Sequence, residues 1–266
     1  MNRYDPDTYW ERLLSEDFSL TGVGYQGLGK NYNMWLYRAR TRIMEWFLGK
    51  YPLDLDSLRI LDIGCGTGFY VEFWRRKGAR YVTGVDLTRK SVTELSRKYR
   101  EYNFYQKDIG ERRIELGGPF DLITAFDVLF HIVSEDRFEN AIRNMSLLAQ
   151  QGSLVLISDN FVGKARPAGL TQAHRTRDRF MQVLGENGIE ILELRPIFYL
   201  MNGPIDISND AILEKYSRMW GVIMSLTKRS ERFGAMMGRL LYAVDGVLIR
   251  LLRDSITTEL LVGRKK

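Results

Sequence analysis

The chain has 266 residues and a mass of 31.0 kDa, with 45% hydrophobic and 27% charged residues. These proportions are typical of a globular protein and exclude a disordered or fibrous chain. The 39 basic and 33 acidic side chains leave a net charge of +6, which is small for a dedicated nucleic-acid binder, so we expect no nucleic-acid partner. One cysteine and two histidines exclude a zinc finger and a disulfide framework and fit a reducing cytoplasm.

Two segments bear on location. The first residues, MNRYDPDTYWERLL, carry acids where an export signal needs a basic start and an apolar run, so we expect a cytoplasmic protein. The apolar stretch at 233–252 is interrupted by Arg239, Asp245 and Arg250. We therefore expect an amphipathic or buried helix there rather than a membrane span.

In chain order, the elements begin with an aromatic, helical segment at 1–50 that contains a glycine-rich break, GVGYQGLGK. From residue 58, short apolar runs alternate with amphipathic stretches, which is typical of a parallel sheet covered by helices on both faces. We expect strands at 59–63, 81–86, 103–106, 120–126, 153–158, about 189–199 and 257–262. We expect helices at 69–77, 89–99, 135–149 and 171–187.

This alternation predicts an α/β fold with a doubly wound, mostly parallel, seven-stranded sheet of the Rossmann-like type. The segment between the last two strands is too long for a plain loop and has helical spacing, which predicts a helical insertion. The predicted organisation is a helical cap at 1–50, an α/β core at 51–204, a helical lid at 205–254 and the last core strand at 255–266. Residues 205–266 hold eleven basic and seven acidic side chains, so they contribute +4 of the net charge.

The clearest motif is LDIGCGTGF at 61–69, where an apolar strand ends in Asp62 and enters Gly64, Gly66 and Gly68 before a helix. Glycines at such a turn let a ligand approach the backbone closely. Dinucleotide-binding turns have the spacing G-x-G-x-x-G, whereas the third glycine here comes one residue earlier. A carboxylate before the loop would repel a phosphate but suits an ammonium group, directly or through water. A nicotinamide-dependent oxidoreductase is therefore disfavoured.

With this acid followed by G-x-G-x-G, the sequence resembles the class I S-adenosylmethionine-dependent methyltransferases of the small-molecule type, over about residues 58–160. The resemblance implies S-adenosylmethionine as the cofactor. It places the ribose hydroxyls on Asp86, next to Leu87, after the second strand. It places the adenine amino group on Asp108, next to Ile109, after the third strand.

Further positions complete the expected cofactor site. The fourth strand ends at Phe126, near where the sulfonium and the acceptor would meet. Cys65 is expected to fill the loop as a small residue and not to act as a nucleophile. In the cap, Tyr25 and Arg38 are expected to face the cofactor, with Arg38 suited to its carboxylate, and ordinary helix packing is the alternative for both. The expected cofactor-binding residues are Asp62, Gly64, Cys65, Gly66, Gly68, Asp86, Leu87, Asp108, Ile109, Phe126, Tyr25 and Arg38.

Two histidines are the candidates for catalysis. Methyl transfer from a sulfonium depends mainly on positioning and desolvation, because the donor is already activated. An acceptor hydroxyl still needs a base, and the candidates are His131, just past the fourth strand, and His174, in the loop after the fifth. Both are expected at the carboxyl edge of the sheet, where α/β folds bind ligands. The alternatives are a packing role for His131 under the cofactor and a solvated loop position for His174.

A metal-dependent chemistry is a second hypothesis. The resemblance extends to catechol-type O-methyltransferases, which bind a divalent metal through an Asp after the fourth strand and an Asp-Asn pair after the fifth. Asp127, Asp159 and Asn160 stand at these places, and oxygen ligands suit magnesium. The preferred interpretation needs no metal. A module that binds the cofactor without catalysis is a third hypothesis.

The acceptor is inferred by elimination. The chain does not carry the motifs by which adenine-methylating, pyrimidine-carbon-methylating and protein arginine methyltransferases are recognised, which leaves a small-molecule or carbohydrate-type hydroxyl. We therefore predict in-line O-methylation of such an acceptor, with S-adenosylhomocysteine as product and the lid shaping the acceptor site. Residues 233–252 repeat apolar positions at helical spacing beside Arg239 and Arg250, so peripheral membrane contact is a secondary alternative.

Overall fold

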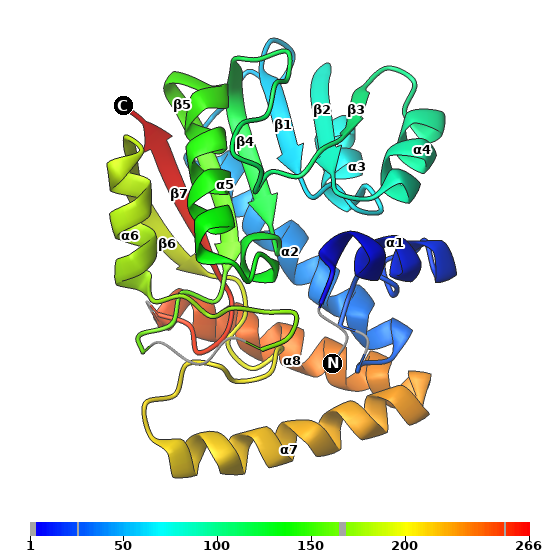
Figure 1. The fold of residues 1–266 in the computed structure, drawn as a ribbon. Helices are drawn as coiled ribbons and strands as arrows, with labels where there is room; N and C mark the ends of the chain where they lie inside the picture. The colour runs from blue at the N-terminus through cyan, green and yellow to red at the C-terminus, as the bar shows by residue number, and fades with distance from the viewer. Residues whose placement is uncertain (1–3, 26, 165–168, 253) are drawn as a thin grey trace.

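A computed structural model of the chain describes residues 4–25, 27–164, 169–252 and 254–266. Its centre is a seven-stranded sheet with the strand order β3-β2-β1-β4-β5-β7-β6 (Figure 1). β7 runs antiparallel to its neighbours β5 and β6, and the other strand pairs are parallel. The strands are β1 (Arg59–Ile63), β2 (Tyr81–Asp86), β3 (Asn103–Gln106), β4 (Phe120–Phe126), β5 (Ala149–Asp159), β6 (Ile189–Pro196) and β7 (Glu259–Lys265). The predicted doubly wound, mostly parallel fold is confirmed.

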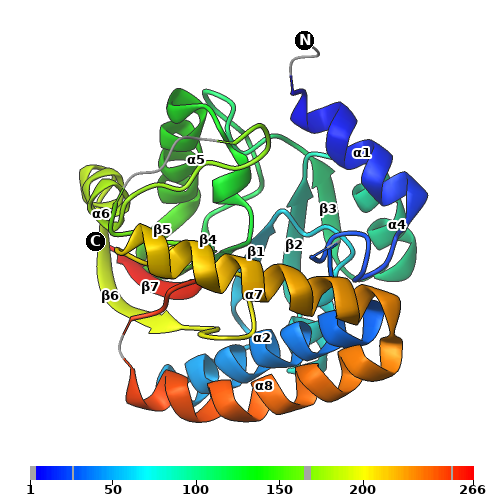
Figure 2. The same ribbon diagram turned by 90° about the horizontal axis from the view of Figure 1, so that it is seen from below.

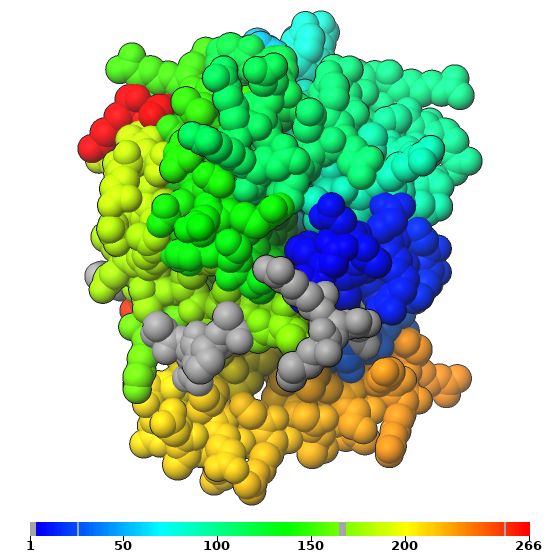
Figure 3. Space-filling view, in the orientation of Figure 1, coloured from blue at the N-terminus to red at the C-terminus, as the bar shows by residue number. Residues whose placement is uncertain are grey.

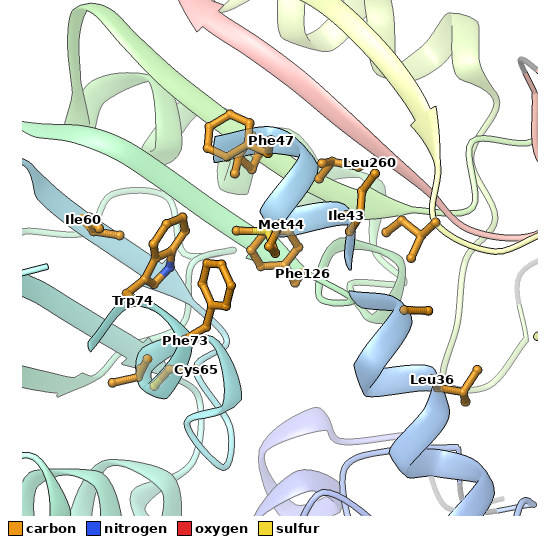
Figure 4. Packing of buried hydrophobic residues seen from close by; sticks show 14 of the residues in the cluster. Leu36, Ile43, Met44, Phe47, Ile60, Cys65, Phe73, Trp74, Phe126 and Leu260 are labelled. Carbon is orange, nitrogen blue, oxygen red and sulfur yellow. The ribbon is translucent and has the colours of Figure 1, made fainter. Parts of the chain in front are cut away.

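Helices cover both faces of this sheet (Figures 1 and 2). They are α1 (Pro6–Glu16), α2 (Lys30–Lys50), α3 (Phe69–Arg76), α4 (Arg89–Lys98), the short 3-10 helix η1 (Leu129–His131), α5 (Glu135–Leu148), α6 (Arg177–Glu186), α7 (Asp210–Arg229) and α8 (Glu231–Leu251). Neighbouring residues of one strand face opposite layers, as strand geometry requires. Ile60 packs with α2 and α3, whereas Leu61 packs with α5 and α6. Figure 4 shows part of the layer that contains α2 and α3, with Met44 and Phe47 of α2 close to the sheet.

Several predicted boundaries were wrong, for local reasons. The helix predicted at 171–187 begins only at Arg177, because the Thr176 hydroxyl caps it by accepting a hydrogen bond from the Arg179 amide. β5 begins four residues before the predicted 153, since Ala149 already pairs with Phe120 across an irregular register. The last strand is shifted from 257–262 to Glu259–Lys265, because both neighbouring strands pair with its basic end.

The helices α7 and α8 form the insertion between β6 and β7. α8 packs along α2, where a Cβ on Gly238 would lie 2.4 Å from Cδ1 of Trp35, so only glycine permits this approach. Asp245 is fully buried in α8 and accepts hydrogen bonds from the backbone amides of residues 199–201. These contacts attach the insertion to α2 and to the chain that follows β6.

Candidate cofactor and acceptor site

The loop between β1 and α3 is shaped by its glycines. Gly64, Gly66 and Gly68 have φ angles of +68°, +48° and +81°, a region that side chains rarely adopt. A Cβ on Gly64 would lie 2.3 Å from Cγ2 of Val128, whereas the nearest atom to a Cβ on Gly66 is 3.8 Å away. Gly64 is therefore required by packing, and Gly66 leaves room for a ligand to approach the backbone.

Asp86, at the end of β2, holds this loop in place. Its Oδ2 accepts a hydrogen bond of 2.8 Å from the Gly66 amide, and its Oδ1 accepts from both the amide and the hydroxyl of Thr88, at 2.9 and 2.7 Å. Ser91 donates to the carbonyl of Gly66 at 2.6 Å. A carboxylate has about four acceptor positions, and three of those on Asp86 are taken, so one remains for a hydroxyl donor from a ligand.

Asp62 lies beneath the loop and is 1% exposed. The Thr124 hydroxyl donates to its Oδ1 at 2.7 Å, and its buried Oδ2 has no hydrogen-bond partner among the described residues. Burial raises the pKa of Asp62 to about 7. An unsatisfied buried carboxylate oxygen is costly, and an ammonium group is the ligand that would satisfy it. Cys65 is also buried, and burial raises the pKa of its thiol, which argues against a nucleophilic role.

The ends of β2 and β3 lie side by side, because Asp86 pairs with Gln106. This register brings Leu87, whose carbonyl accepts from the Gln106 side chain, near the segment that carries Asp108 and Ile109. Asp108 accepts from the Gly110 amide at 2.7 Å and forms an ion pair with Arg137 of α5. Ile109 is buried between the sheet and α5.

Arg40 of α2 is a site residue that the sequence analysis missed. Its Nη2 and Nε lie 2.6 and 2.9 Å from Oδ2 of Asp127, which follows Phe126 with a φ of +58°. The Ser158 hydroxyl donates to the other oxygen of Asp127 at 2.9 Å. The ring of Phe126 stacks on Tyr70 of α3 with centroids 4.0 Å apart. This cluster joins α2 and α3 to the ends of β4 and β5.

The contacts described for the two predicted cap residues lie within the cap. Arg38 is exposed and its guanidinium stacks on Trp35, 4.2 Å from the ring centroid. Tyr25 is 40% exposed and its ring lies against Gly27. Instead, Val23 is the cap residue over Gly66, with Cγ1 4.0 Å from the position of a Cβ.

The 3.6-residue spacing of apolar positions in α2 could have indicated that Arg40 faces the sheet. The buried residues Leu36 and Ile43 of α2 lie four before and three after it, so Arg40 shares their face whereas Arg38 does not.

His131 is held in a defined orientation. Its Nδ1 lies 2.9 Å from the Thr171 carbonyl and must donate to it, which leaves the lone pair on Nε2. The edge of Trp10 contacts the ring, with centroids 4.7 Å apart, where α1 meets the segment after β4 (Figure 3). Burial lowers the pKa of His131 and outweighs the opposing effects of the Thr171 hydrogen bond and the Asp127 charge. His131 is therefore neutral at neutral pH.

The residues proposed for a metal do not form a metal site. Asp127 is bound by Arg40, whose positive charge beside the carboxylate opposes the binding of a cation there. Asp159 accepts from the Asn160 amide at 2.7 Å, and the side-chain oxygen of Asn160 accepts from Thr258 at 3.0 Å. In the part of the chain that the structure describes, no group of three His, Cys, Asp or Glu side chains could hold a metal ion.

Comparison with known proteins agrees with this geometry. Residues 60–152 match a family model described as a methyltransferase domain. The ubiquinone biosynthesis O-methyltransferase of Agrobacterium fabrum strain C58 is 34% identical over 132 residues, which are 47% of this chain and 52% of that protein. The 27-O-demethylrifamycin SV methyltransferase of Amycolatopsis mediterranei is 27% identical over 74% of this chain and 70% of that protein. The chain thus spans about half the length of the first of these relatives.

Solved structures share the fold. Magnesium protoporphyrin IX methyltransferase from Synechocystis PCC 6803 with bound SAH has a TM-score of 0.57 at 17% identity, covering 98% of this chain and 100% of that one. The [4+2]-cyclase SpnF has a TM-score of 0.52 at 17% identity, covering 84% and 80%. One of these proteins is named a methyltransferase and the other a cyclase, so the shared fold alone does not determine the reaction.

Proposed function

Residues 60–152 match a methyltransferase domain, and we propose that the chain is a class I S-adenosylmethionine-dependent methyltransferase that methylates a hydroxyl of a small-molecule or carbohydrate-type acceptor. The observation that carries the proposal is the glycine loop held by Asp86 over the unsatisfied carboxylate oxygen of Asp62. The relatives named as O-methyltransferases support transfer to oxygen.

The residues around the loop fit this cofactor. Asp86 would accept a hydrogen bond from a ribose hydroxyl with its remaining acceptor position, and Asp108 would accept from the adenine amino group. The free oxygen of Asp62 would face the ammonium group of the methionine portion, and Gly66 allows the close approach. When bound, S-adenosylmethionine supplies a methyl group already activated by its sulfonium. The chain's own contribution is then to position the acceptor and to exclude water.

His131 is the better placed of the two histidines to act as a base. Its Nδ1–H is fixed on the Thr171 carbonyl, so Nε2 can take the proton of an acceptor hydroxyl. The lowered pKa keeps this nitrogen unprotonated. His174 lies three residues after Thr171 in the same loop and is half-buried. It stays a second candidate for the same role.

The experiment is a turnover assay on the full chain with methyl-labelled S-adenosylmethionine and a panel of phenols, aliphatic alcohols and sugars. We expect S-adenosylhomocysteine to form only when a hydroxyl acceptor is present, with the label in a methyl ether. Label found only on nitrogen or carbon would contradict O-methylation. Tight cofactor binding without turnover on a broad panel would favour a non-catalytic module.

A further inference from the structure

The outer face of α8 carries a row of exposed apolar side chains. Met236, Leu240, Val244, Val247 and Leu251 follow one another every three or four residues and are 37% to 73% exposed. This spacing places them on one side of the helix. The opposite side, which includes Gly238 and Asp245, is buried against α2 and the chain after β6.

α7 carries a second row on the neighbouring helix. Ile212, Met219, Val222 and Leu226 have the same kind of spacing and are 42% to 60% exposed, whereas Trp220 faces inward and is buried. We call these nine side chains the hairpin face. Single exposed apolar residues are common on proteins, but two adjacent rows of them indicate a binding surface.

The charge around the hairpin face is mostly positive. Between residues 210 and 252 the exposed cations are Lys215, Arg218, Lys228, Arg229, Arg232, Arg239 and Arg250. The same segment has four acids: Asp210 begins α7, Glu214 pairs with Arg218, and the other two are engaged elsewhere. Glu231 accepts from the amides of Lys30 and Asn31 at the start of α2, and Asp245 is buried.

The combination of apolar rows and positive charge indicates which kind of partner the hairpin face would bind. A second copy of the chain would place like charges opposite one another around the apolar rows, which is unfavourable. The surface of an anionic bilayer complements both features, because acyl chains take up the apolar rows and acidic headgroups attract the cations. None of the helices in the described ranges has the length and apolar character needed to cross a bilayer. The contact would therefore be peripheral.

We propose that the hairpin face binds the surface of an anionic phospholipid membrane, with α7 and α8 lying in the plane of the headgroups. In Figure 1 the hairpin lies beyond the carboxyl ends of the parallel strands, at the same end as the glycine loop. Membrane binding would thus hold the site near the lipid surface. The proposal does not depend on methyl transfer.

The test is co-sedimentation of the full chain with vesicles of phosphatidylcholine and phosphatidylglycerol in equal parts, compared with pure phosphatidylcholine. We expect the chain to sediment with the anionic vesicles, and high salt to weaken this binding. Replacing Leu240→Asp and Val247→Asp together should lower the partition coefficient by at least about tenfold. Both positions are exposed, so the variant should fold, which circular dichroism and an unchanged affinity for S-adenosylmethionine would verify.

Two comparisons sharpen the result. Leu147→Asp changes a side chain that is 66% exposed on α5, away from the hairpin, and should leave vesicle binding unchanged. Arg239→Glu with Arg250→Glu should weaken binding to anionic vesicles. No sedimentation with anionic vesicles, or equal sedimentation with neutral ones, would overturn the proposal. A dimer in light scattering that the Leu240 and Val247 changes abolish would assign the face to a second copy instead.

Discussion

Substituting Gly64→Ala should destabilise the chain by about 2–5 kcal/mol. The φ of +68° costs a side chain about 1–2 kcal/mol. The new Cβ would lie 2.3 Å from Cγ2 of Val128, in a close-packed region, and relieving such a contact costs about 1–3 kcal/mol. Urea unfolding, followed by circular dichroism, measures the change in the free energy of unfolding. Affinity for S-adenosylmethionine should fall as well, because the loop must shift.

The two contributions can be separated. Adding Val128→Ala to Gly64→Ala removes the contact but not the backbone strain, so the loop geometry should recover only in part. Gly185→Ala is the matched control, because α6 has helical φ there and nothing lies within 4 Å of the added Cβ. That control should be neutral or stabilising by less than about 1 kcal/mol. A Gly64→Ala chain as stable as the wild type would refute the reasoning about this loop.

Three other predictions concern charged groups of the site. The pKa of Asp62 is raised to about 7 in the folded chain, so its folded form holds a proton that the unfolded chain loses near pH 4. Stability should therefore fall as the pH rises from about 4 to 7. Affinity for S-adenosylmethionine should rise through pH 7, because the ammonium group needs the ionised carboxylate. Asp62→Asn should remove that rise when binding is titrated over a series of pH values. Arg40→Gln breaks the partly buried pair with Asp127 and should lower the free energy of unfolding by about 2 kcal/mol, measured by thermal unfolding. Arg40→Lys should restore little of this stability, because lysine lacks the two-nitrogen geometry. Full recovery of stability in the lysine variant would argue against that contact. His131→Ala should lower turnover at least about a hundredfold, with the affinity for the cofactor nearly unchanged. His174→Ala is the comparison variant. Equal turnover in the wild type and in both variants would exclude a histidine base.

The sheet could be predicted from the sequence because its signals are local. The first four strands have the predicted bounds: β1 is followed by a glycine, β2 ends in an acid and β4 is followed by one. The glycine spacing identified the loop, because positive φ angles and the close approach of Val128 both demand glycine. The start of α6 was misplaced because the capping of Thr176 outweighs the polar pattern before it.

The contacts between the cap and the site could not be predicted from the sequence, because they join segments that are far apart in the chain. Arg40 and Asp127 are 87 residues apart, and only the packing of α2 on the sheet brings them together. Trp10 meets His131 because α1 packs against the segment after β4, more than a hundred residues later in the chain. The helical period places Arg38 beside Trp35, which packs against α8, whereas Arg40 lies on the face with Leu36 and Ile43. The roles of the site residues, the division into cap, core and lid, and a cytoplasmic location stay predictions.

Calorimetric titration with S-adenosylmethionine tests the central claim most directly, with NADH as a competitor and Asp86→Asn and Asp56→Asn as paired variants. Asp56 is an exposed acid that pairs with Arg80 away from the loop, so its variant should bind like the wild type. The account predicts micromolar binding that NADH does not displace and that Asp86→Asn weakens by at least about tenfold. A folded chain that binds no S-adenosylmethionine, or binds it equally well without the Asp86 carboxylate, would contradict the account.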